Sequence, residues 1–183
     1  MNFEGYEGEN IRVVAYTNCE EAELFLNGKS LGKVAIDQPG HAEWMVPYEK
    51  GSIKVVGYDN GKPVIDEDRT TTKKAAKLML KLENEISEAN GRDIALVSCY
   101  CVDEEGLEVP DATPYVKFIS NSLGKIVGTG SDNADYNPVT EPNRKMRAGR
   151  VSVAVLVGKQ GGTLKLYAEA EGLTPTVLNI ELK

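Results

Sequence analysis

Apolar and polar residues alternate in short runs along most of the chain, and turn residues separate the runs. In the clearest run Leu24 and Leu26 share one face, because successive side chains of a strand point to opposite faces. Asn27 and Gly28 follow directly, and these two residues best tolerate the positive φ angles of a two-residue hairpin turn. The pattern predicts a β-hairpin in which Leu26 lies opposite Lys29.

Similar runs predict further strands in the first part of the chain. A second hairpin turn is expected at Asn60-Gly61, and Pro63 confines the strand that follows to a sheet edge. A turn is also expected at Gln38-Pro39-Gly40. Besides the two arms of the first hairpin, the expected strands are residues 11–16, 41–46, 53–58 and 63–68. Such closely spaced short strands are typical of an antiparallel β-sandwich.

The second part repeats this organisation after a stretch without apolar periodicity at residues 69–76, which is the expected domain boundary. A long polar loop is expected at residues 129–149, where functional segments are common. The expected strands are residues 78–83, 94–103, 115–120, 124–128, 150–157, 163–169 and 176–182. We therefore predict an all-β protein with two consecutive immunoglobulin-like antiparallel β-sandwich domains, 1–73 and 74–183.

Charge and composition exclude several classes of partner. The formal net charge of −7 argues against nucleic acid, since phosphate binding requires a basic surface. Apolar residues form 41% of the chain, yet no run is long enough to suggest a membrane span. The sequence thus predicts neither a nucleic-acid nor a membrane partner.

Three cysteines, an odd number, do not form a disulfide framework. Cys99 and Cys101 are two residues apart on an expected strand, so we expect both to be small buried hydrophobes. A zinc site would need about four ligands, and the chain has a single His and no Cys-x-x-Cys. We expect no metal and no cofactor, and the unpaired cysteines favour a cytoplasmic over a periplasmic or secreted protein.

One stretch carries a family resemblance. T-N-C-E-E-A-E-L-F-L-N-G-K-S-L-G, residues 17–32, resembles the segment that follows the catalytic barrel in bacterial β-galactosidases of glycoside hydrolase family 2. N-F-E-G at residues 2–5 resembles the N-W-E-G at which that barrel ends. The second half is similar to invasin-type bacterial immunoglobulin-like domains and to the domain that ends many of these enzymes. The resemblance implies a retaining β-galactosidase or β-glucuronidase as the parent protein.

Glycoside hydrolysis needs two carboxyl groups about 5 to 5.5 Å apart for retention of configuration. In the resembled family both glutamates come from the barrel, and here no strands alternate with helices of barrel length. A nucleophilic triad would depend on His41 alone, without a G-x-S-x-G sequence. We therefore predict no catalytic residues in this chain.

Binding chemistry leaves a few candidates. Exposed aromatic rings can cover the apolar face of a sugar, and we consider Tyr136, Trp44 and Tyr48 as carbohydrate contacts. Oxygen ligands between Asp132 and Asp135 leave a loop calcium as a minor alternative. Four basic residues in and directly after the same loop could dock on an acidic neighbour, although a solvated face is the simpler interpretation: Arg144, Lys145, Arg147 and Arg150.

The leading hypothesis is a non-catalytic C-terminal accessory part of a β-galactosidase-like enzyme. It would support the upstream catalytic barrel, extend the rim of the active site or form a homo-oligomer contact. The first alternative is a carbohydrate-binding module for a β-galactoside glycan. The second is a cell-surface adhesin built of immunoglobulin-like repeats.

Overall fold

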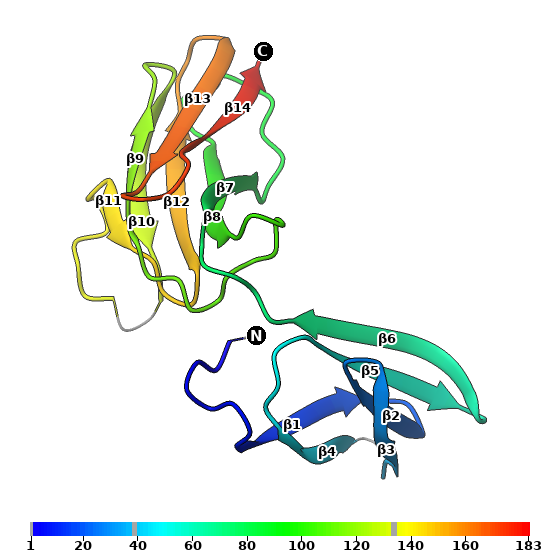
Figure 1. Ribbon diagram of the computed structural model, residues 1–183. Helices are drawn as coiled ribbons and strands as arrows, with labels where there is room; N and C mark the ends of the chain where they lie inside the picture. The colour runs from blue at the N-terminus through cyan, green and yellow to red at the C-terminus, as the bar shows by residue number, and fades with distance from the viewer. Residues whose placement is uncertain (1, 38–39, 133–134) are drawn as a thin grey trace. The chain divides into compact units, whose positions relative to one another are not determined.

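The computed structural model describes residues 2–37, 40–132 and 135–183, and its regular elements there are all β-strands (Figure 1). Among these residues no helix exists that could cross a membrane. The chain divides into two compact units, unit 1 with residues 1–71 and unit 2 with residues 72–183. Both are antiparallel, which confirms the prediction of an all-β protein of immunoglobulin-like sandwich type.

Unit 1 packs a two-stranded sheet against a four-stranded one. The smaller sheet pairs β1 (Asn10–Thr17) with β4 (Gly40–Pro47). The larger sheet has the order β3-β2-β5-β6. Its strands are β2 (Glu21–Leu26), β3 (Lys29–Ala35), β5 (Ser52–Asp59) and β6 (Lys62–Thr70).

Both expected hairpin turns of unit 1 are present. Asn27 and Gly28 have φ angles of 50° and 80°, and Leu26 pairs with Lys29 as predicted. Asn60 and Gly61 repeat the conformation, with φ angles of 51° and 72°. The other expected turn lies partly outside the described residues, since these exclude 38 and 39. The two Asn-Gly pairs therefore fix both hairpins of the larger sheet.

The core of unit 1 lies between its two sheets. Ala22 and Leu24 are fully buried in β2, and they face a buried row from β4. Trp44 belongs to that row and donates its indole N–H to the carbonyl of Gly32 at 3.3 Å. Gly32 has a φ angle of 106° at the point where the β2–β3 ladder shifts register. The alternation read from residues 41–46 is thus confirmed, with its apolar face inward.

Unit 2 is a larger sandwich of two four-stranded sheets, with the orders β10-β12-β8-β7 and β11-β9-β13-β14. The strands of the first sheet are β7 (Lys77–Leu82), β8 (Ile94–Val102), β10 (Gly124–Gly130) and β12 (Arg150–Val157). Those of the second are β9 (Tyr115–Ser120), β11 (Asn143–Lys145), β13 (Gly162–Glu169) and β14 (Thr176–Leu182).

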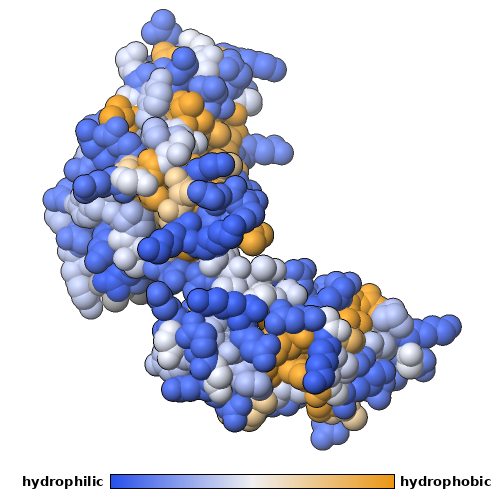
Figure 2. Space-filling model, viewed as in Figure 1, coloured by the Kyte–Doolittle hydropathy of each residue, from blue (hydrophilic) through white to orange (hydrophobic). Residues whose placement is uncertain are grey.

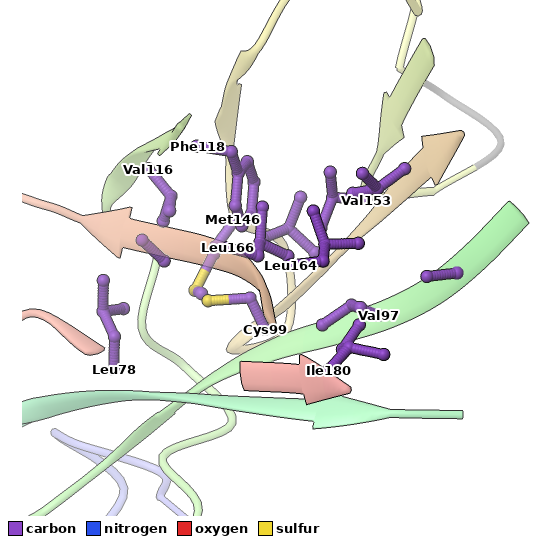
Figure 3. Packing of buried hydrophobic residues seen from close by; sticks show 14 of the residues in the cluster. Leu78, Val97, Cys99, Val116, Phe118, Met146, Val153, Leu164, Leu166 and Ile180 are labelled. Carbon is purple, nitrogen blue, oxygen red and sulfur yellow. The ribbon is translucent and has the colours of Figure 1, made fainter. Parts of the chain in front are cut away.

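The inner faces of these two sheets form the core of unit 2. Phe118 and Leu166 from one sheet lie beside Val153 and Cys99 from the other (Figure 3). Cys99 and Cys101 are both fully buried and free, as expected of small hydrophobes. Burial raises the pKa of the Cys99 thiol to about 12, because the charged thiolate is disfavoured in an apolar interior.

The expected loop at residues 129–149 is shorter than predicted. β10 continues to Gly130, and β11 forms within the loop as an edge strand that pairs with β9 through Arg144 and Val116. The three residues of β11 show no apolar alternation, so the sequence pattern gave no sign of the strand. The connection between β10 and β11 is residues 131–142.

Candidate functional site

Arg144 is the centre of the most elaborate polar arrangement in unit 2. Its side chain is 1% exposed, so the expectation of a solvated basic face is wrong at this position. The guanidinium donates from Nη2 to the carbonyls of Thr129 at 3.0 Å and Pro138 at 2.7 Å. It also donates from Nε to the Thr129 hydroxyl at 3.1 Å. Arg144 thereby ties β11 to β10 and to the connection between them.

Asp135 supplies the counter-charge. Its Oδ1 lies 3.0 Å from Nη1 of Arg144, and its side chain is 6% exposed. Burial by itself raises the pKa of Asp135, but hydrogen bonds from Asn137 and Ser131 and the charge of Arg144 outweigh that effect. The pKa is consequently lowered to about 2, and the carboxylate stays ionised as a structural partner rather than a proton donor.

Tyr136 follows Asp135 directly and is 94% exposed. Val139, in the same connection, is also exposed, and its carbonyl accepts a hydrogen bond from the backbone N–H of Thr129 at 2.7 Å. The connection is therefore anchored on both sides of Tyr136 by Arg144 and β10. The contacts anchor the chain on either side of Tyr136, while its side chain extends into solvent.

The other two expected aromatic contacts lie in the interior of unit 1. Trp44 is 8% exposed because it alternates with Ala42 and Val46 on the inner face of β4. Tyr48 is 4% exposed, and its ring contacts Phe3 with centroids 5.5 Å apart. Buried rings cannot cover a sugar face, so this is a correction to the sequence analysis. Of the three residues only Tyr136 has the exposure that such a contact needs.

Glu43 forms a small cluster of charged and polar side chains with Arg12 and His41 on the surface of unit 1. Glu43 accepts two hydrogen bonds from Arg12 at 2.5 Å, and Nε2 of His41 lies 3.3 Å away. The Arg12 hydrogen bond is the main reason that the pKa of Glu43 is lowered to about 2. A carboxylate ionised so strongly is unsuited to act as a general acid.

Two of the other three basic residues, Arg147 and Arg150, also pair within the chain. Arg147 lies 3.1 Å from Asp132, and Arg150 lies 2.5 Å from Glu108. Among the described residues no group of three or more His, Cys, Asp or Glu could hold a metal ion. The calcium alternative involves residues 133 and 134, which lie outside the described part of the chain.

Two family profiles match successive parts of the chain. Residues 8–65 match a domain of unknown function, DUF4982. Residues 78–179, more than half of the chain, match the glycoside hydrolase family 2 C-terminal domain 5. The two matches fall within unit 1 and unit 2 respectively.

Curated relatives and solved structures agree with these matches. The β-galactosidase BoGH2A of Bacteroides ovatus is 35% identical over 94% of this chain and 21% of its own length. A β-galactosidase of Thermoanaerobacter pseudethanolicus is 28% identical over 92% of this chain and 23% of its length. A crystal structure of a glycosyl hydrolase family 2 member from Bacteroides cellulosilyticus superposes with a TM-score of 0.93 at 31% identity, over 98% of this chain and 25% of that one. The chain thus spans about a fifth to a quarter of each of these three proteins.

Proposed function

The chain belongs to the glycoside hydrolase family 2 C-terminal domain 5 family, and from this premise we propose that it is a non-catalytic accessory part of a family 2 glycosidase. Its parent would be a retaining β-galactosidase or β-glucuronidase. The two sandwiches would support the catalytic barrel, extend the rim of its active site or form an oligomer contact.

One observation carries this proposal. The match covers nearly all of this chain but only about a fifth of BoGH2A, so most of that β-galactosidase lies outside the match. Within the described residues the regular elements are strands, whereas a catalytic barrel alternates strands with helices. The low pKa values of Glu43 and Asp135 further support a structural role for these two carboxylates.

The test compares hydrolysis of nitrophenyl β-galactoside and β-glucuronide by three proteins. These are this chain alone, BoGH2A without its matching segment, and a chimaera in which this chain replaces that segment. We expect no hydrolysis by the chain alone, a lower melting temperature for the shortened enzyme, and recovery in the chimaera. Hydrolysis by the purified chain alone, above the rate of a mock purification, would contradict the proposal.

The exposure of Tyr136 favours a second candidate function, binding of a galactose-containing glycan. The ring would cover the apolar face of a pyranose, and the anchored connection would hold it in place. Calorimetric titration with β-galacto-oligosaccharides is expected to show weak binding that Tyr136→Ala abolishes and Tyr115→Ala leaves unchanged. Tyr115 is a matched control because it is also exposed, on β9. Equal binding by both variants, or none by the native chain at millimolar ligand, would exclude Tyr136 as a platform.

A further inference from the structure

Three Asn-Gly pairs occur in the chain, at Asn27, Asn60 and Asn90. An Asn side chain beside Gly can react with its own backbone, because Gly has no Cβ to hinder the approach. The Gly nitrogen loses its proton to solvent and attacks the side-chain carbon Cγ. The new N–Cγ bond closes a succinimide ring, and the Cγ–Nδ2 bond breaks to release ammonia. Water then opens the ring and leaves either Asp or isoaspartate.

The two hairpin turns of unit 1 allow a direct comparison between two of these pairs. Each turn has the tripeptide Asn-Gly-Lys, and Asn27 and Asn60 have φ angles of 50° and 51°. Both asparagines are also exposed. Local sequence, φ angle and access to solvent are therefore nearly equal, so a difference in reactivity depends on what holds each side chain.

The Asn27 side chain is held by β5 and by the turn before it. Its Oδ1 accepts the backbone N–H of Ser52 at 2.9 Å, and its Nδ2 donates to the carbonyl of Lys50 at 3.3 Å. The amide also lies close over Gly51, where an added Cβ would clash with Oδ1. It must leave these contacts before Cγ can approach the nitrogen of Gly28.

Asn90 is held as well, and here the attacking nitrogen is also engaged. Oδ1 of Asn90 accepts the backbone N–H groups of Arg92 and Asp93, both at 2.9 Å. The N–H of Gly91 donates to the carbonyl of Gly158 at 3.0 Å. Both reacting groups of this pair are thus occupied, and the pair is only partly exposed.

Asn60 differs from both. Among the described residues nothing hydrogen-bonds its side-chain amide or the N–H of Gly61, and a Cβ added at Gly61 would meet no atom within 4 Å. The backbone N–H of Asn60 donates to Oε2 of Glu20 at 2.7 Å, a contact that involves neither reacting group. The end of the β5–β6 hairpin projects to the right in Figure 1, and Figure 2 shows mainly hydrophilic residues there.

We propose that Asn60 is a site of spontaneous deamidation, with water as the co-reactant, and that the folded chain protects Asn27 and Asn90. The reaction replaces a neutral amide by a carboxylate, so it adds one negative charge to the formal net charge of −7. This inference goes beyond the proposed accessory function and does not depend on it.

The isoaspartate product should loosen the end of the β5–β6 hairpin. It lengthens the backbone of a two-residue turn by one carbon atom, whereas the register of Asp59 opposite Lys62 depends on the length of that turn. Two carboxylates already lie there, since Asp59 accepts the backbone N–H of Glu20 and Glu20 accepts that of Asn60. A third negative charge beside them is repelled.

The test is incubation of the full 183-residue chain at mildly alkaline pH, which favours loss of the proton from the Gly nitrogen. Samples are digested with pepsin in acid, where the reaction is slow, and Asp and isoaspartate at the three sites are measured by tandem mass spectrometry. We expect Asn60 to react about fivefold to thirtyfold faster than Asn27, because Asn27 must first lose two hydrogen bonds. In urea that unfolds the chain, the rates at these two sites should become similar.

Two matched variants assign the charge change to its site. Asn60→Gly should abolish the acidic species that accumulates on anion-exchange chromatography, and Asn27→Gly should leave it. Gly accepts the positive φ angle of either turn, so both variants keep the hairpins. In the purified isoaspartate form, amide hydrogen exchange should be faster at the end of β5 and the start of β6 than in the unreacted chain.

The proposal is overturned if Asn27 or Asn90 reacts as fast as Asn60 in the folded chain. It is also overturned if Asn60 stays intact in the folded chain but reacts in urea, because the turn itself would then protect it. An acidic species that still forms in Asn60→Gly at the native rate would assign the reaction to another residue. Unchanged hydrogen exchange in the isoaspartate form would refute the loosening of the hairpin.

Discussion

Leu24 is the best position at which to test whether the two sheets of unit 1 hold each other in place. The residue is fully buried near the middle of β2, and it packs between its sheet neighbours and the inner face of β4. Leu24→Ala removes three carbon atoms from this interior and leaves a cavity. Substitutions of this kind cost about 2 to 5 kcal/mol, depending on how far the site can collapse.

That cost is large against the whole of unit 1. A unit of 71 residues is expected to have an unfolding free energy of about 4 to 10 kcal/mol. A loss of about 3 kcal/mol, with a urea m-value near 1 kcal/mol/M for a small domain, moves the unfolding midpoint down by about 3 M. Leu24→Ala should therefore leave unit 1 with only a small unfolding free energy at room temperature.

The assay uses the single tryptophan of the chain. Trp44 is buried in the same core, so its emission shifts to longer wavelength when unit 1 unfolds. Urea titrations of the native chain, Leu24→Ala and Met45→Ala are compared by this signal. Met45 follows Trp44 on β4 and points to solvent, so its truncation should change the unfolding free energy by less than about 0.5 kcal/mol. Equal midpoints for the two variants would refute the packing of β2 against β4.

Four further outcomes are expected, each from one local feature. Arg144→Met should speed chymotrypsin cleavage within residues 131–142, because four oxygen acceptors lose their donor. The lowered pKa of Asp135 makes its stabilisation complete above about pH 5 and lost as pH falls towards 2. Asp135 lies in unit 2, so the urea midpoint of that unit, followed by far-UV circular dichroism, should fall less across this range in Asp135→Asn than in the native chain. Gly28→Val should lower the unfolding free energy of unit 1 by about 1 kcal/mol in the Trp44 titration, since φ is 80° at this turn and a β-branched residue is strained there. Cys99 and Cys101, with thiol pKa values raised by burial to about 12 and 11, should resist iodoacetamide at pH 8 until urea is added, and modification of the folded chain would contradict their burial.

The candidate site was only partly visible in the sequence. Tyr136 stood out because it is an aromatic residue in a polar segment. For Trp44 the alternation with Ala42 and Val46 already favoured a core position, and the structure places it there. Arg144 had no distinguishing signal, since its neighbours Lys145, Arg147 and Arg150 share its charge. Its burial depends on β11 pairing with β9, a contact between segments far apart in the chain.

The sequence by itself determined the local structure of this protein. Period-two alternation assigns the apolar row of β4 to the interior, and Asn-Gly pairs fix the hairpins, because both signals act over a few residues. Which strands become neighbours depends on contacts between distant residues, so tertiary structure alone decided them. The burial of Arg144 with Asp135 arises at this level. The burial of Arg144 is set by segments that pack around it from elsewhere in the chain, and its local sequence does not encode that.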